Sequence, residues 1–444
     1  MPPDSSFYHG TAVLTAAACA AKIIGAIFKI PLNRLLGPEG AGHFAVACNL
    51  YLLLLSIAAA GLPLALSRLI CEANTLGQRE RVGVLFRSGL RLLLGIGGLC
   101  SGFLFFGAGS LARWMRDPGA IHGIQLLAPA VLFTCVSGAF RGLFQGRQQM
   151  GPTAAVQVLE ASSKLLLGLA ALLSAVWAGW SPSRAAGAAT LGMTVGAGLG
   201  TGYFLLHYRS APVLPGLPST QAVRSILSLA IPITIGSAGT QGIHVLSGWI
   251  ILARLQDSFG LSVAEASSLY GIYAMAHTLC LLPPALIQPM TVSIIPAVTE
   301  AISRRDRQKA WKKERAALAL TVGVAVPAGI CLIVLCVPIQ RLLYGYDAVT
   351  LSIAGPLLAI LGPASACHCL LLVTNAILQA RGKALWSAGS TAIGGIVSLA
   401  VTDLLTGNPH FGIHGAAIGT LAYPLLALVC NTLLMKYDRQ ERTL

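Results

Sequence analysis

Residues 11–30 read TAVLTAAACAAKIIGAIFKI, twenty positions that are apolar except for two threonines and two lysines. A helix of about twenty apolar residues is long enough to cross a lipid bilayer once. Lys22 and Lys29 are seven positions apart, so they lie on the same face of such a helix. An ionisable side chain at membrane depth faces water or a partner, and by default it marks a substrate or ion path. The stretch therefore predicts a membrane helix lining a cationic cavity, which favours an anionic cargo.

The composition of the whole chain also indicates a membrane protein. Of its 444 residues, 55% are hydrophobic and 10% are charged, and the mean hydropathy is +0.75. Soluble domains carry about 25% charged residues, so a soluble fold is excluded. Most of the net charge of +15 lies in short connections, as the positive-inside rule expects. These connections are too short to form a nucleic-acid-binding module, and we expect no nucleic acid partner.

Apolar blocks of this length continue to the end of the chain and predict an all-α polytopic membrane protein with about twelve transmembrane helices. The first block is expected to be a retained helix, because no basic segment of a signal peptide precedes it. The expected spans are 11–31, 42–69, 89–112, 121–142, 153–178, 185–207, 224–253, 268–299, 316–342, 348–379, 384–405 and 412–435.

The connections between these spans predict the domains and the orientation. The stretch 208–223 is the least apolar connection near the middle, and we interpret it as a cytoplasmic linker. It would separate an N-terminal six-helix bundle, 1–207, from a C-terminal six-helix bundle, 224–444. With both termini in the cytoplasm, the inner segments hold 19 Lys and Arg residues and the outer loops hold 6. This bias supports that orientation.

The two halves also repeat short patterns of sequence. Gln145-Gly146-Arg147 precedes Ala154 with the spacing by which Gln379-Ala380-Arg381 precedes Ala388. Glu72-Ala73 and Glu300-Ala301 each precede a basic loop. These matches predict a duplicated architecture, and transporters built from repeats place their site between the repeated bundles.

Lys22 and Lys29 are the first candidates for binding the cargo. Lys22 is near the centre of its span, where it would meet a phosphate or diphosphate as a point charge. Lys29 is nearer the outer end, and snorkelling to the interface is an equal alternative for it. Arg34 is expected to anchor the helix at the outer interface and to guard the mouth of the cavity.

Glu160 and Lys164 are four positions apart, with the acid on the N-terminal side, which is the favourable order for a helical ion pair. A structural pair is the preferred interpretation. In the alternative, Lys164 faces the cavity while Glu160 holds it or exchanges a proton. His244 and His277 lie on polar helix faces, where a hydrogen-bonded histidine is favoured over one that titrates in the cavity.

Signals for an enzyme are missing from the sequence. It contains no nucleophile elbow, no phosphate-binding loop and no metal-spaced set of His and Asp, and the outer loops are short. We therefore expect a transporter with no catalytic residues, no cofactor and no metal.

Three strings of the sequence are distinctive. They are Gly61-Leu-Pro63 with Ser67 and Glu72, then Arg141-Gly142-Leu-Phe-Gln145-Gly146-Arg147, and finally Glu160 with Lys164. They resemble the stage V sporulation protein B branch of the multidrug/oligosaccharidyl-lipid/polysaccharide (MOP) exporter superfamily, which is related to the MurJ-type lipid II flippases. The resemblance is dense over the first five spans and thinner to the last.

The resemblance implies two six-helix bundles in a V shape, like those of MATE and MurJ transporters. It also implies a cationic cavity that flips undecaprenyl-diphosphate-linked sugars from the inner to the outer leaflet. Lys22 resembles a cavity arginine of the family, Lys29 a second basic position, and Glu160 with Lys164 an acidic–basic pair. The strings around Gly61 and Arg141 would be structural or gating elements. The chain departs from the family because spans two and eight hold no arginine that matches the other cavity arginines. Arg68 is too near the cytoplasmic end of span two, and His277 is the nearest substitute in span eight.

The implied partners are an undecaprenyl-diphosphate-linked glycan, membrane lipids and cell-wall synthesis proteins, and the implied location is the bacterial plasma membrane. Lipid II is the favoured cargo, and a different lipid-linked oligosaccharide or polysaccharide is the main alternative. A cation-coupled multidrug exporter ranks lower, because it needs carboxylates in spans one or seven. A non-transporting scaffold for wall synthesis is a further alternative.

Overall fold

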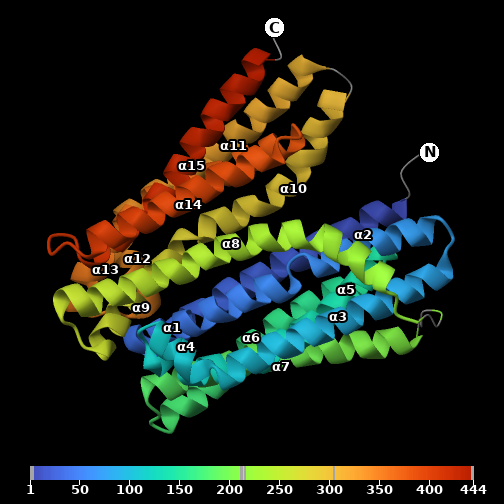
Figure 1. Cartoon of the computed structure of the whole chain (residues 1–444). Coiled ribbons are helices and arrows are strands. Elements are labelled where there is room, and N and C mark those ends of the chain that lie inside the picture. The colour runs from blue at the N-terminus through green and yellow to red at the C-terminus, as the bar shows by residue number, and fades with distance from the viewer. Residues whose placement is uncertain (1–4, 211–213, 215–216, 304–305, 442–444) are drawn as a thin grey trace. The chain divides into compact units, whose positions relative to one another are not determined.

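The computed structural model describes residues 5–210, 214, 217–303 and 306–441, and all the elements in these ranges are helical (Figure 1). Both chain termini and five residues of the expected linker lie outside the described residues. The helices are α1 (Ser5–Ala59), α2 (Leu62–Thr75), α3 (Arg79–Phe106), α4 (Ala108–Trp114), η1 (Pro118–Ala120), α5 (Ile121–Gly146), α6 (Met150–Trp177), α7 (Pro182–Ser210), α8 (Thr220–Phe259), α9 (Val263–Cys280), α10 (Leu282–Ser303), α11 (Arg307–Val334), α12 (Cys336–Tyr344), α13 (Ala348–Ala380), α14 (Ala384–Thr406) and α15 (Ile413–Glu441).

Helix α1 consists of two helices joined at a kink. Gly37 adopts φ 65° there, a left-handed conformation that glycine reaches without steric cost. Pro38 follows, and a proline disfavours helical backbone in the residue before it. The candidate span Ala12–Thr75 has 64 residues, roughly 96 Å of helix at 1.5 Å per residue, enough for two crossings.

Eleven segments of the described chain are long and apolar enough to cross a membrane, and the first of them is the double-length segment. The protein is therefore a multi-pass membrane protein with about twelve crossings. This agrees with the spans expected from the sequence.

The chain forms two compact units, Met1–Val245 and Leu246–Leu444. The division falls inside α8 and not in the expected linker 208–223. The reason is that the first half of α8 packs on unit 1, where the backbone at Ala230 passes directly over Gly61. Near its other end, Arg254 donates two hydrogen bonds to Asp403 of unit 2, at 2.7 and 2.6 Å.

The two units repeat one pattern of helix contacts. In unit 1, α5 packs against α2, α3, α4 and α7, and in unit 2, α13 packs against α10, α11, α12 and α15. Both central helices end in the same turn. The Gln149 N–H donates to the Phe144 carbonyl and the Lys383 N–H to the Leu378 carbonyl, each at 2.8 Å. The duplication indicated by the sequence is thus present in the fold.

Glycines allow α2 and α5 to pack unusually closely. Gly142 and Gly146 are four residues apart on α5, so they share one face. A Cβ at Gly142 would be 3.0 Å from the Pro63 carbonyl oxygen, and one at Gly146 would be 2.8 Å from the Ser67 carbonyl oxygen. Small residues at such spacing let membrane helices approach each other. Most of the residues that carry the family resemblance in α2 and α5 therefore lie at the contact between these two helices.

A second set of glycines brings α7 against α6. A Cβ at Gly192 would be 3.0 Å from the Lys164 carbonyl oxygen, and one at Gly196 would be 3.1 Å from the Glu160 carbonyl oxygen. The backbone of α6 is therefore fixed on α7 at the two residues whose side chains carry charge. This contact positions Glu160 and Lys164 inside unit 1.

Candidate substrate-binding site

Arg141 on α5 and Glu160 on α6 form an ion pair inside unit 1. Arg141 Nη2 donates to both oxygens of the Glu160 carboxylate, each at 2.7 Å, and the two side chains are 25% and 27% exposed. The pair between Glu160 and Lys164 predicted from their spacing is not formed. Bonds to a guanidinium held on a packed helix are stronger than an i,i+4 pair, which is worth only about 0.2–0.5 kcal/mol.

Lys164 instead lies against α1. Its Nζ is 5.1 Å from the centre of the Phe28 ring, which is fully buried. A cation over an aromatic face is attracted by the ring quadrupole. Lys29 on α1 is close enough to Lys164 for the two positive charges to interact. The structure thus brings Lys29 and Lys164 together from two helices.

These residues form a polar cluster, which we define as Lys29, Arg141, Gln157, Glu160 and Lys164. It contains three cationic side chains and one carboxylate, so two positive charges remain when all are ionised. Arg141 Nε and Gln157 Oε1 are buried without a hydrogen-bond partner among the described residues. Excess positive charge and an unused N–H donor at Arg141 Nε suit such a cluster to binding an anion, whereas Gln157 Oε1 is an acceptor and does not contribute.

Of the other predicted residues, three are exposed positions on helices of unit 1 and one belongs to unit 2. Lys22 is exposed on α1 two turns before Lys29, and Arg34 is exposed just before the Gly37 kink. His244 is exposed on α8. His277 belongs to unit 2, where its ring stacks on Tyr273 with 5.8 Å between the centroids.

The residues of the resemblance strings divide into two groups. Gly61, Pro63, Ser67, Gly142 and Gly146 lie at close helix contacts. Glu72 is exposed at the end of α2 and Gln145 is half-buried. Arg141 belongs to the polar cluster, and Arg147 lines a pocket described below.

The structure also contains a buried ionic group that the sequence analysis did not find. His43 Nδ1 is 2.7 Å from Asp117 Oδ1, and Asp117 is fully buried. Glu39 is 3.6 Å from the other ring nitrogen, Nε2. The spacing of Glu39 and His43 indicates a helical pair, but Asp117 is 74 residues from His43 and no local pattern connects them. In the described part of the chain, no three His, Cys, Asp or Glu side chains gather as metal ligands would.

Comparison of the sequence with known proteins gives a consistent result. The model of a family described as polysaccharide biosynthesis protein matches residues 7–302. Stage V sporulation protein B of Bacillus subtilis is 24% identical, over 96% of this chain and 83% of the relative. The lipid II flippase MurJ of the same organism is 24% identical, over 89% of this chain and 76% of the relative.

Solved structures with the same fold are transporters. An inward-facing multidrug resistance MATE family transporter of the MOP superfamily matches with a TM-score of 0.80 and 15% identity, over 97% of this chain and 95% of the other. A MOP superfamily transporter from Pyrococcus furiosus matches with a TM-score of 0.67 and 15% identity, over 97% and 95% of the two chains. The fold of this chain is therefore that of the MATE-like transporters.

Proposed function

Because this chain belongs to the polysaccharide biosynthesis protein family, we propose that it is a flippase for polyprenyl-diphosphate-linked glycan precursors. It moves the precursor from the inner to the outer leaflet of a bacterial plasma membrane, with both of its own termini in the cytoplasm. Lipid II is the favoured cargo, since a lipid II flippase is among the relatives that match most of the chain. The protein acts as a transporter and not as an enzyme.

The observation that carries this proposal is the excess of positive charge in the polar cluster. Lys29 and Lys164 come from two helices and lie near each other, and like charges at membrane depth repel strongly unless an anion lies between them. A diphosphate supplies that anion. Glu160 accepts two hydrogen bonds from Arg141, so its charge is balanced by that arginine and not by Lys164.

In this proposal each residue has a simple physical role. Lys22, exposed on the same helix as Lys29, meets the diphosphate first as a hydrated point charge. Lys29 and Lys164 then hold the head group while the lipid tail stays in the bilayer. Alternating access moves the head group to the outer side, as in transporters built from repeated bundles.

The shared MATE-like fold makes a cation-coupled drug exporter the main competing function. Such an exporter needs a carboxylate that is accessible to a cation or a cationic drug. Glu160, four residues before Lys164 on α6, accepts two hydrogen bonds from Arg141, which opposes this role. A scaffold that does not transport would need no charge in the cluster.

The test is the appearance of lipid II on the outer leaflet of cells depleted of their own flippase. We expect the parent protein to restore it and a well-expressed Lys22→Ala variant to fail. Failure of a correctly inserted parent would exclude lipid II as the cargo. Equal rescue by Lys22→Ala would remove that lysine from the mechanism.

A further inference from the structure

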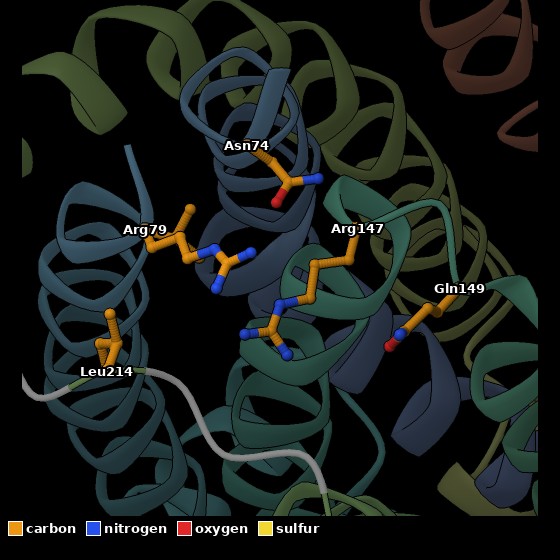
Figure 2. A pocket seen from close by; sticks show the side chains of 6 residues that line it. Asn74, Arg79, Arg147, Gln149 and Leu214 are labelled. Atoms are coloured by element: carbon orange, nitrogen blue, oxygen red, sulfur yellow. The ribbon is translucent and has the colours of Figure 1, made fainter. Parts of the chain in front are cut away.

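A pocket of about 450 Å³ lies in unit 1 at the ends of α2, α3, α5 and α6 (Figure 2). This volume is in the range of pockets that hold small ligands. Three segments of the chain meet there: the α2–α3 connection, the α5–α6 connection and residue 214. The described lining consists of Asn74, Arg79, Val82, Arg147, Gln149 and Leu214.

The lining carries two positive charges and no negative one. Figure 2 shows the guanidinium groups of Arg79 and Arg147 directed into the same space from two different connections. Asn74 and Gln149 add carboxamide groups, and none of the six lining residues is acidic. Two guanidinium groups that share a pocket repel each other, and an anion between them turns this repulsion into attraction.

Two helix N-termini add to this positive field. Helix α3 begins at Arg79 and α6 begins at Met150, and neither start has a side-chain cap. The first backbone N–H groups of an α-helix lack partners within the helix and carry the positive end of its dipole. Phosphate groups commonly bind at such ends. Arg79 at the start of α3 and Gln149 just before α6 both line the pocket, together with Arg147.

The corresponding turn of unit 2 is built differently. Arg381 occupies the position of Arg147 after the central helix, but it donates hydrogen bonds to Glu314 and Asp438. In that unit the arginine therefore holds helices together. In unit 1 the neighbouring junction of α3, α5 and α7 is filled by the rings of Phe86, Phe140 and Tyr208. Arg147 lines the pocket.

We propose that this pocket binds a phosphate group, held by Arg79 and Arg147 and by the N-termini of α3 and α6. The phosphate comes from an anionic phospholipid head group or from a soluble phosphate, since both present the same oxygens to the arginines. The described lining shares no residue with the polar cluster, and occupancy of the pocket does not depend on the proposed flippase function.

The test measures the thermal unfolding midpoint of the purified protein. In the lipid arm, nanodiscs of phosphatidylcholine alone are compared with nanodiscs that also contain phosphatidylglycerol. In the soluble arm, inorganic phosphate is titrated against protein in phosphatidylcholine, with chloride at equal ionic strength as the reference. A ligand that binds only the folded state raises the midpoint. Stabilisation in the first arm identifies a lipid phosphate, and stabilisation in the second identifies a soluble one.

Arg79→Gln and Arg147→Gln are compared with Arg81→Gln, which removes the same charge from an exposed residue outside the pocket that bonds to Gln78. We expect each pocket variant to weaken the response by about tenfold in ligand concentration or more, while Arg81→Gln responds as the parent does. If one of the two pocket variants, Arg79→Gln or Arg147→Gln, fails to fold, the other still tests the proposal. No phosphate-dependent shift of the parent, or equal losses in all three variants, would overturn the proposal.

Discussion

At the scale of single residues, the charged side chains of unit 1 form contacts that their spacing in the sequence does not predict. Glu160 lies one helical turn from Lys164, yet it pairs with Arg141 on another helix. The ammonium group of Lys164 lies over the face of the Phe28 ring instead. The types and spacing of these residues are visible in the sequence, but the partner depends on how α5, α6 and α1 pack. The sequence therefore identifies which residues are charged at membrane depth, but it does not identify which of them form ion pairs with one another.

The Arg141–Glu160 pair should contribute measurably to stability. Glu160→Gln leaves Arg141 partly buried without its counter-charge, and we expect a loss of about 2–3 kcal/mol in the free energy of unfolding. The measurement is the denaturation midpoint of the purified protein, with Glu80→Gln on the exposed surface as the control. Adding Arg141→Gln to Glu160→Gln should recover part of the loss. Independent, additive effects would show that the pair is not energetically coupled.

The buried His43–Asp117 contact should also stabilise unit 1. Asp117→Ala removes the partner of a buried imidazole, so we expect a loss of about 1–3 kcal/mol in the free energy of unfolding. Denaturation compares it with Glu72→Ala, a carboxylate exposed at the end of α2. A midpoint for Asp117→Ala equal to that of the control would contradict the assigned contact.

At the scale of elements, glycine positions determine which helices meet. A Cβ at Gly142 would be 3.0 Å from both the Leu66 side chain and the Pro63 carbonyl oxygen. We expect Gly142→Leu to force α2 away from α5 and to reduce the yield of folded protein strongly. Gly98→Leu on α3 is the control, because a Cβ there meets nothing within 4 Å. Size-exclusion profiles of both variants check this, and equal yields would rule out close α2–α5 packing.

Unit 2 relies on an arginine where unit 1 relies on aromatic rings. Arg381 Nε and Nη2 donate to Glu314 at 2.9 and 2.6 Å, while Nη1 donates to Asp438 at 2.9 Å. Burial opposes the charge of Arg381, but the hydrogen bonds to Glu314 and the attraction of both carboxylates outweigh it and raise the pKa of Arg381.

A lysine cannot reproduce this arrangement, because it lacks the planar fork of donors. We therefore expect Arg381→Lys to lower the free energy of unfolding by about 2–4 kcal/mol despite keeping the charge. The unfolding midpoint is compared with that of Arg341→Lys, whose arginine lies in the last turn of the short helix α12. Equal midpoints for the two variants would show that charge alone holds the junction.

At the scale of the whole molecule, most of the fold follows from the sequence. Blocks of about twenty apolar residues predict the crossings, because every backbone group in a bilayer must be hydrogen-bonded within the protein. Short repeats such as Gln145-Gly146-Arg147 predict the duplication. The boundary inside α8 does not follow, since Thr220–Phe259 is a continuous helix that packs on unit 1 at one end and bonds to unit 2 at the other.

The pocket of Arg79 and Arg147 could not be predicted either. Both residues belong to basic connections that the sequence explains by the positive-inside rule alone. Their convergence depends on the three-dimensional packing of two turns that are far apart in the chain. A long-range contact of this kind also pairs Glu160 with Arg141 and not with Lys164.

The most direct test of the proposed flippase measures translocation in reconstituted vesicles. The readout is the fraction of a fluorescent polyprenyl-diphosphate-linked glycan that a membrane-impermeant quencher reaches over time. We predict rapid exchange for the parent, at least about tenfold slower exchange for Lys164→Gln and partial recovery for Lys164→Arg, because the cargo is held by charge. Lys312→Gln, on an exposed part of α11, should behave as the parent does. Equal rates for the parent and Lys164→Gln in folded, correctly inserted protein would contradict the cationic site.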